Sequence, residues 1–302
     1  MTSRVSFSVW GPAFGHDLRT VAPLVRKAGF HGIQLDAGSR MLNLAELSSS
    51  GRREVRHLLG SIDLQLTSIR IDFGGAGLGP TADADRALDR VDTILNAAAE
   101  LACPVVCIDL GRLPPVQRVA RPRPKVTVQD AGLLILPDPV APVESEPDPV
   151  PTKIDPALIS HWQQAMEQLG EIADRYGAVV ALGSTLSSFA GLASLLKQVN
   201  CPWFGVDFDP SLLLRDEWSL TDLFDEVGPL IRHVRARDAV KGEDRRTRPA
   251  IIGRGDVAWR DVLHHLDDAG YTNSITIDPS ELNDPSASAI AGAKQLKAIL
   301  ET

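Results

Sequence analysis

The residues best suited to chemistry in this sequence are charged and polar side chains at the ends of short apolar segments. Because side chains alternate along a strand, stepping in twos along each segment brings one polar set to a common side. Burying so many charges on apolar strands is costly unless they pair or bind a ligand. The pattern therefore indicates a catalytic or ligand-binding site, with structural ion pairs as the alternative. The set consists of Trp10, Gln34, Asp36, Arg70, Asp72, Asp109, Gly183, Asp207, Asp209, His233, Arg235, Arg237 and Asp278.

The segments that must position these residues alternate between β-rich runs and amphipathic helical stretches, which is typical of βα units on a parallel sheet. The expected strands cover residues 5–10, 32–36, 67–73, 104–109, 178–183, 203–209, 231–237 and 274–278. The expected helices cover residues 17–28, 43–60, 83–101, 157–176, 187–198, 219–227, 258–269 and 286–300. This series favours a closed sheet, so we expect one domain over residues 1–302, a (β/α)8 TIM barrel. The polar set would then lie at the carboxyl ends of the strands, where catalytic residues of such barrels stand.

One segment interrupts the alternation. Residues 112–155 hold 10 of the 21 prolines of the chain, so they cannot form a helix. A connection of this length is usually functional or irregular, and it follows the fourth expected strand. We therefore predict a long Pro-rich insertion at the carboxyl face of the barrel, either a lid or a plain surface loop. Residues 131–136 within it are apolar enough for a short strand or a plug.

Composition sets limits on the class of protein. The chain has 302 residues, of which 44% are hydrophobic, and a net charge of −8. The negative charge argues against general binding of nucleic acid, which needs clustered Lys and Arg. No apolar run approaches the ~20 residues of a membrane span, and the first residues resemble a strand rather than a signal peptide. We therefore expect a cytoplasmic protein without a membrane partner. The three cysteines give no disulfide framework, and Cys103 and Cys107 are interpreted as core residues.

Four short motifs in a fixed order carry a family resemblance. They cover residues 204–210, 232–238, 253–259 and 270–278, and an earlier segment at 28–36 supports them. The series resembles the sugar-phosphate isomerase/epimerase family, also called xylose isomerase-like TIM barrels. The early segment carries Gln34 where the family more often has Glu.

The resemblance implies a metal site that this sequence lacks in part. The family generally holds one divalent cation with a Glu ending the fifth strand, an Asp ending the sixth, a His in the seventh and a Glu ending the eighth. The two glutamates also move a proton at the carbon beside a carbonyl, while the cation stabilises the enediolate. The corresponding residues here are Gly183, Asp209, Arg235 and Asp278. Glycine transfers no proton, and arginine stays protonated and does not bind cations.

We therefore expect no tightly held metal. Asp209 and Asp278 are weak ligand candidates for Mn, Zn, Co or Mg, and a cation would bind only if those two carboxylates sufficed. As a hypothesis, the guanidinium of Arg235 replaces the cation, and Asp209 and Asp278 grip it.

The resemblance gives each residue a provisional role. Asp209 and Asp278 are the expected catalytic residues of an isomerase or epimerase that acts on a sugar or sugar phosphate. The alternative is a non-catalytic relative that binds a carbohydrate-like ligand or a protein partner. Moderately apolar outer helix faces, together with the resemblance, suggest a homo-oligomer. The expected substrate-binding residues are Trp10, Asp36, Arg70, Asp72, Asp109, His233, Arg235, Arg237 and Arg254.

Several residues keep two interpretations. His233 is either a base or a core histidine bonded to Asp207, and the second is favoured because buried polar groups need partners. Glu281 either replaces a lost carboxylate or faces solvent, and its position after Pro279 favours solvent. Asp238 is expected to cap or orient its loop.

Overall fold

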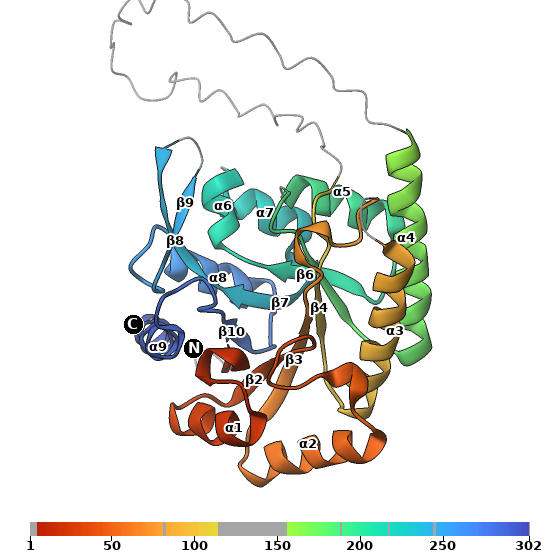
Figure 1. The fold of residues 1–302 in the computed structure, drawn as a ribbon. Coiled ribbons are helices and arrows are strands. Elements are labelled where there is room, and N and C mark those ends of the chain that lie inside the picture. The colour runs from red at the N-terminus through yellow and green to blue at the C-terminus, as the bar shows by residue number, and fades with distance from the viewer. Residues whose placement is uncertain are drawn as a thin grey trace, which may run out of the picture.

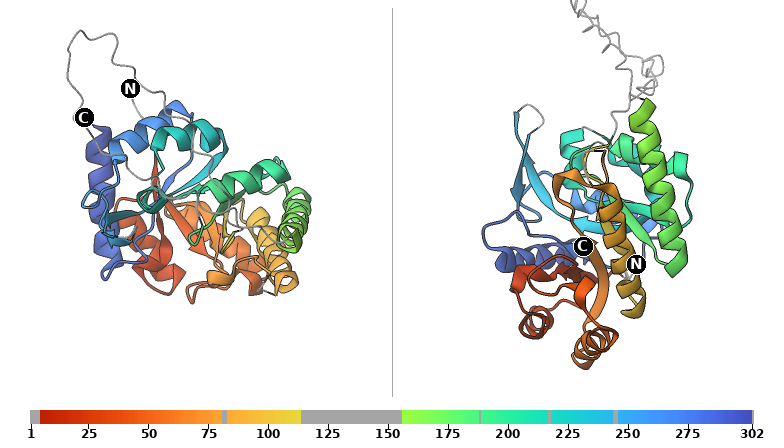
Figure 2. Two further views of the ribbon diagram at one scale, coloured as in Figure 1. Left: turned by 90° about the horizontal axis from the view of Figure 1, so that it is seen from above. Right: turned by 45° about the vertical axis from the view of Figure 1, so that its right-hand side comes forward.

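The described part of the chain closes into a barrel of parallel strands surrounded by helices (Figure 1; Figure 2, left). The structure is a computed structural model that describes residues 5–80, 83–113, 156–187, 189–216, 218–243 and 246–301. Strand order around the barrel follows the chain, and the last barrel strand pairs with the first. The predicted TIM barrel is therefore confirmed.

The barrel strands coincide closely with the predicted ones, because each is a short buried run between turn residues. Adjacent strands all pair in parallel, and the register shifts once between β2 and β3 and once between β6 and β7. The strands are β1 (Phe7–Trp10), β2 (Gly32–Asp36), β3 (Gln65–Ile71), β4 (Val106–Asp109), β5 (Val180–Gly183), β6 (Phe204–Phe208), β7 (Ile231–Ala236) and β10 (Ile275–Ile277).

Helices lie between the strands, and several begin at a capping side chain. Asp17, Ser48, Asp83, Ser219 and Asp284 each accept a hydrogen bond from a backbone N–H in the first turn. The helices are α1 (Leu18–Lys27), α2 (Ser49–Ser61), α3 (Ala84–Glu100), α4 (Pro156–Tyr176), α5 (Phe189–Val199), α6 (Ser211–Asp216), α7 (Leu220–Val227), α8 (Trp259–Asp268) and α9 (Pro285–Leu300).

Three features differ from the sequence prediction. The second helix begins at Ser49 rather than near residue 43, because Ser48 caps it after a short 3-10 turn at Leu44–Glu46. A short helix of six residues, α6, was not predicted, and it begins at Ser211, shortly after β6 ends at Phe208. After β7 the chain forms an antiparallel hairpin of β8 (Asp238–Lys241) and β9 (Thr247–Ala250). The hairpin was missed because its residues lack a period-two apolar pattern; it projects from the barrel in Figure 1.

The insertion lies almost entirely outside the description. Residues 114–155, which include the apolar segment 131–136, are not among the described residues. Within the described ranges, no helix combines the length and apolar character needed to cross a bilayer.

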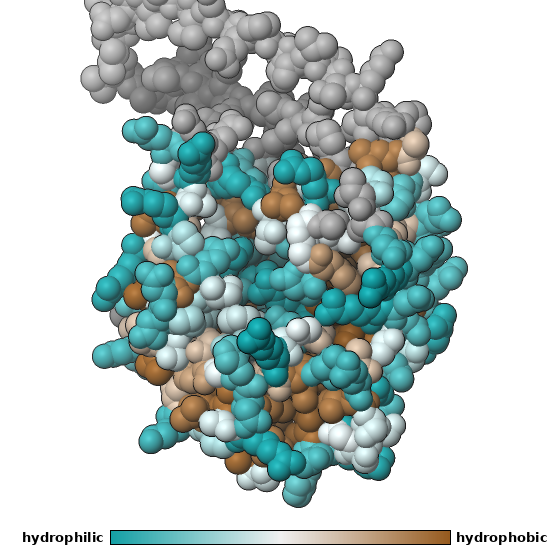
Figure 3. Space-filling view, in the orientation of Figure 1, coloured by the Kyte–Doolittle hydropathy of each residue, from teal (hydrophilic) through white to brown (hydrophobic). Residues whose placement is uncertain are grey.

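Among the described residues, the outer surface has an apolar groove beside α1 and α2. Figure 3 shows hydrophobic residues gathered low on the face, in the region of α1 and α2. A groove between these helices is lined by the apolar side chains of Leu18, Met41, Leu42, Leu47, Val55 and Leu58.

Candidate functional site

Five strands of the barrel end in an aspartate, or are directly followed by one, and each of these aspartates closes the same turn. Each carboxylate accepts the backbone N–H two residues further along, as Asp side chains do in turns. This arrangement fixes every one of these carboxylates at the mouth of the barrel. The pairs are Asp36 with Gly38 at 3.0 Å, Asp72 with Gly74 at 2.7 Å, Asp109 with Gly111 at 2.9 Å, Asp209 with Ser211 at 3.0 Å and Asp278 with Ser280 at 3.0 Å.

Asp209 and Asp278 also hold arginines with their second oxygen. Asp209 Oδ2 accepts from Arg237 Nε at 2.6 Å. Asp278 Oδ2 accepts from Arg70 Nη1 at 3.2 Å, and this ion pair joins β3 to the turn after β10. Both carboxylates are at most 4% exposed. Both expected catalytic residues, Asp209 and Asp278, therefore form an ion pair with a guanidinium group.

The expected grip of Asp209 and Asp278 on Arg235 is wrong. Asp207, one inward step from Asp209, forms the ion pair with the guanidinium of Arg235 instead. The reason is that β6 and β7 run in parallel, so successive inward residues of the two strands pair in the same order. Asp207 therefore pairs with Arg235, and two residues further along in each case Asp209 pairs with Arg237. Arg235 is 2% exposed, so this pair is fully inside the barrel.

His233 is the core histidine that the sequence favoured. Its Nδ1 lies 2.6 Å from Asp207 Oδ1, and its Nε2 lies 2.8 Å from Thr276 Oγ1. Thr276 in turn bonds Ser8 at 2.8 Å. Both ring nitrogens thus have buried partners inside the barrel, and His233 acts by holding Asp207 rather than by facing the mouth.

Electrostatics keep the interior ions charged. Burial alone would raise the pKa of Asp207, but Arg235 and His233 hold it well below its ordinary value. Burial would lower the pKa of Arg235, yet Asp207, Asp278 and Asp209 together raise it. Burial likewise opposes ionisation of Asp278, and Arg70 followed by Arg235 brings its pKa below the ordinary value. The mouth is a set of mutually neutralised charges.

The residues present do not fit a divalent cation. In both Asp209 and Asp278, one carboxylate oxygen accepts a hydrogen bond from a backbone N–H and the other accepts one from an arginine. In the described ranges, Cys107, Asp207 and His233 bring ligand-type atoms within 4.8 Å of one another. However, burial and Asp207 raise the pKa of the Cys107 thiol well above its ordinary value. The same Asp207 already binds a guanidinium, and a second positive charge there would be repelled.

Gly183 shows where the missing glutamate would have pointed. A Cβ added to Gly183 would lie 3.6 Å from Asp207 Oδ2, the oxygen that pairs with Arg235. The Asp207–Arg235 pair therefore occupies the space in front of the glycine.

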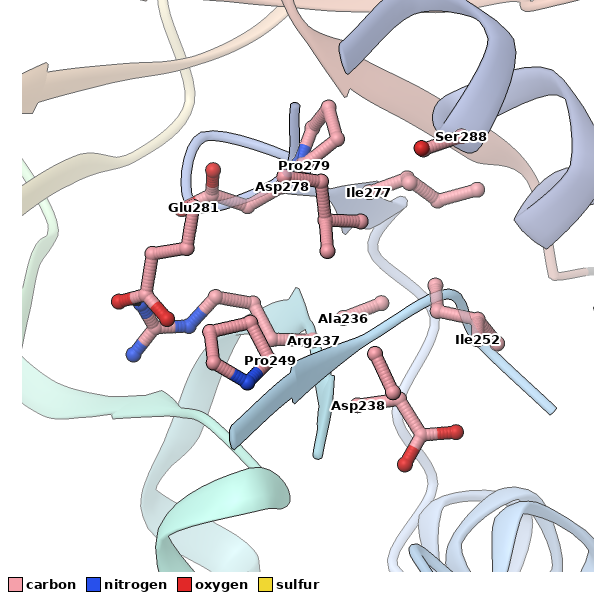
Figure 4. A pocket seen from close by; sticks show the side chains of 12 residues that line it. Ala236, Arg237, Asp238, Pro249, Ile252, Ile277, Asp278, Pro279, Glu281 and Ser288 are labelled. Atoms are coloured by element: carbon pink, nitrogen blue, oxygen red, sulfur yellow. Dashed lines mark hydrogen bonds and ion pairs between the residues drawn. The ribbon is translucent and has the colours of Figure 1, made fainter. Parts of the chain in front are cut away.

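A recess opens at the rim, between the ends of β7 and β10 and the β8–β9 hairpin. It is shallow: its cavity volume is about 20 Å³, room for about one water molecule, within about 320 Å³ of empty space that includes open solvent. Arg237, Asp278 and Glu281 line it together with Pro249 of the hairpin (Figure 4). Glu281 does not simply face solvent, as the sequence favoured: its Oε1 accepts from Arg237 Nη1 at 2.6 Å, while its side chain remains 53% exposed.

Other predicted site residues have mainly structural contacts. Among the described residues, the Asp36 carboxylate bonds only the Gly38 N–H of its own turn, and Asp109 adds a bond from the backbone N–H of Thr185 at 3.3 Å. Asp72 lies 3.7 Å from Arg70, at the edge of the network. Trp10 ends β1, and its buried Nε1 has no acceptor among the described residues.

Arg254 lies on the loop that follows β9, and it is exposed. As expected, Asp238 organises that loop: its carboxylate accepts from the backbone of Gly253 at 2.8 Å and from Trp259 Nε1 at 3.2 Å. Across the described ranges, the Arg254 side chain forms no hydrogen bond or ion pair with the mouth residues.

Two sequence signals point to the ion-paired half of the mouth. The tripeptide Asp-Pro-Ser begins at both Asp209 and Asp278. It begins again at Asp284, which caps α9, so the tripeptide is informative only directly after a strand. The second signal is the equal separation of Asp207 from Arg235 and of Asp209 from Arg237, which agrees with neighbouring pairs once the register of the two strands is known.

Fold and site together define a TIM barrel with a polar, ion-paired mouth at the carboxyl ends of its strands. The sequence pattern of the xylose isomerase-like TIM barrel family matches residues 22–299. The chain therefore belongs to this family. Among curated proteins, none has a sequence that matches the chain significantly.

Solved structures with the same fold are distant in sequence. A xylose isomerase domain protein from Planctomyces limnophilus has 17% identity and a TM-score of 0.73, over 98% of this chain and 96% of its own. A xylose isomerase-like TIM barrel protein from Mycobacterium smegmatis, in complex with magnesium, has 16% identity and a TM-score of 0.69, over 99% and 98%. D-psicose 3-epimerase with D-tagatose from Clostridium cellulolyticum H10 has 14% identity and a TM-score of 0.70, over 99% and 100%. At these identities the likeness concerns the fold.

Proposed function

We propose that this protein is a metal-independent enzyme of the sugar isomerase/epimerase type, which moves a proton at the carbon beside a carbonyl. The observation that carries the proposal is the filling of the mouth by three arginine–aspartate pairs. Arg70, Arg235 and Arg237 supply fixed positive charge in the part of the barrel where the family resemblance puts a cation.

The guanidinium groups suit an oxygen-rich ligand. Arg70 Nε, Arg235 Nε and Trp10 Nε1 are buried donors without an acceptor among the described residues. Unpaired buried donors are costly, so an acceptor oxygen from a ligand or water would stabilise them. A donor aimed at a carbonyl oxygen also stabilises the negative charge that develops when the neighbouring carbon loses its proton.

Charge balance favours an uncharged sugar over a sugar phosphate. Each mouth arginine already has a carboxylate partner, so the site has no surplus positive charge for a dianion. Phosphate sites normally present unpaired Arg, Lys or backbone N–H groups. We therefore propose a neutral ketose or a related carbonyl sugar as the substrate class.

Asp209 and Asp278 retain the carboxylates at the family's strand-end positions. Two roles are compatible with their contacts: proton transfer, as the sequence suggests, or anchoring of Arg237 and Arg70 beside the ligand. Their ion pairs favour anchoring, because a carboxylate whose oxygens are both engaged is a weaker base.

Solvent-exchange measurements test the proposal. The full chain, treated with chelator, is incubated in deuterium oxide with neutral ketohexoses such as D-fructose and D-tagatose and, separately, with ketose phosphates. We expect deuterium to enter the carbon beside the carbonyl of a neutral ketose, at a rate that added Mn²⁺ leaves unchanged. Exchange that appears only with Mn²⁺ would reject the metal-independent mechanism.

The second candidate is a non-catalytic relative that binds a carbohydrate-like ligand. The observation that favours it is the engagement of both Asp209 and Asp278 in ion pairs while they are buried. Ligand binding by calorimetry without any exchange would support this candidate over the enzyme.

We further propose that the apolar groove between α1 and α2 is covered by a second copy of the chain. Its rim carries Asp17 and the exposed ion pair of Arg19 with Glu54, opposite charges that can complement themselves across a two-fold axis.

A further inference from the structure

Glu281 differs from the other carboxylates around the mouth arginines in its access to solvent. Its side chain is 53% exposed, whereas that of Asp209 is 4% exposed and that of Asp278 is fully buried. A group that exchanges a substrate proton with water needs such access, and the two buried aspartates lack it. This difference separates anchoring carboxylates from one that is free to react.

The contacts of Glu281 leave one oxygen available. Oε1 accepts from Arg237 Nη1 at 2.6 Å, and Oε2 has no hydrogen-bond partner among the described residues. Figure 4 shows the carboxylate against the guanidinium of Arg237 at the recess, while Asp238 points away from it. A base and an electrophilic donor thus lie side by side, facing the same space.

The backbone around Glu281 is held in a tight turn. Asp278 Oδ1 accepts from Ser280 N at 3.0 Å, and Pro279 O accepts from Leu282 N at 3.0 Å. The turn places Glu281 three residues beyond the end of the last barrel strand, on the rim of the recess. Its longer side chain reaches Arg237 from there.

We infer that Glu281 is the acid–base residue of this site and that Arg237 is its electrophilic partner; this rests on the proposed function. Oε2 takes the proton from the carbon beside the carbonyl, and that C–H bond breaks. Its electron pair forms a C=C bond, while the carbonyl pair moves onto oxygen, where the N–H groups of Arg237 stabilise the enediolate. The protonated carboxyl exchanges with water and returns a proton to carbon as the enediolate collapses. No oxidant or cofactor is consumed.

The experiment compares substitutions in the full chain by the deuterium exchange described above. Glu281→Gln should lower the exchange rate by at least about 100-fold, the usual contribution of a positioned general base, while ketose affinity measured by calorimetry stays close to that of the wild type. The matched control is Glu243→Gln, an exposed carboxylate on the β8–β9 hairpin, and it should retain the wild-type rate.

A rescue measurement separates chemistry from a structural role. Glu281→Ala removes the carboxylate, and added formate should restore part of its exchange activity, which a purely structural contact would not allow. Circular dichroism and thermal melting confirm that each variant folds. Exchange in Glu281→Gln close to the wild-type rate would overturn the assignment while leaving the proposed function intact. Absence of exchange in the wild-type protein, with ligand bound, would overturn both.

Discussion

The same aspartate turn occurs in both halves of the barrel mouth, at the ends of β2, β3 and β4 and at the ends of β6 and β10, but the other contacts of the aspartates differ. In the first half, Asp36, Asp72 and Asp109 each close a turn onto a glycine. In the second half, Asp209 and Asp278 close the same turn onto a serine and offer their other oxygen to an arginine.

This difference shows that a strand-end aspartate is not by itself a functional residue. The turn bond is local and follows from the Asp side chain, so it appears wherever an aspartate ends a barrel strand. The arginine pairs require residues from other strands, and they create the buried charge that a site needs. We therefore place the chemistry beside the aspartates of the second half, with Arg70 contributed by β3.

The largest effect is expected from breaking the deepest ion pair. Arg235→Met leaves Asp207 buried with His233 as its remaining side-chain hydrogen-bond partner, and a buried charge that loses its ion-pair partner costs about 3–5 kcal/mol. Chemical denaturation should show a drop of that order in the free energy of unfolding. In the first half, Asp36→Asn keeps an acceptor for Gly38 and should change stability by less than about 1 kcal/mol.

A double variant checks the cause. Asp207→Asn combined with Arg235→Met removes the isolated charge, so it should be more stable than Arg235→Met alone. If the single variant is as stable as the wild type, the two halves do not differ in the way described.

A smaller effect concerns acid stability. The pKa of Asp278 is below its ordinary value of 3.8, so its stabilising contribution is complete above that value and is lost as the pH falls through the lower, folded value. Asp278→Asn should lower the free energy of unfolding at neutral pH by about 1–3 kcal/mol. Denaturation curves at successive pH values should show this deficit shrinking below pH 3.8.

An exposed carboxylate provides the comparison for that series. Asp72 is 49% exposed and lies 3.7 Å from Arg70, so Asp72→Asn should lower the free energy of unfolding at neutral pH by less than Asp278→Asn does. A deficit in Asp278→Asn that stays constant through acid would contradict the role of its ionised form.

Most of the barrel was predictable because its signals are local. The apolar run Phe204–Phe208 predicts a buried strand, and the amphipathic pattern of Ala84–Glu100 predicts a helix. The β8–β9 hairpin lacks such a pattern, since only four paired residues on each side hold it together. The beginning of α2 depended on the cap by Ser48, which competes with an earlier start near residue 43.

The members of the site were predictable, but their partners were not. The sequence indicated that Arg70, Asp209, Arg235, Arg237 and Asp278 share the mouth. Which carboxylate meets which guanidinium depends on register, and the shift between Val206 and Asp207 in the β6–β7 pairing is invisible in the sequence. The sequence therefore assigned Arg235 to Asp209, although Asp207 holds it.

The central claim is that guanidinium groups take the place of a cation at this mouth. Electron paramagnetic resonance of free Mn²⁺, titrated with the chelator-treated full chain, tests it most directly. We predict that the signal of the hydrated ion keeps its full intensity up to excess protein. A stoichiometric loss of that signal that disappears in Asp209→Asn and Asp278→Asn would show a metal site built on these carboxylates and would contradict the account.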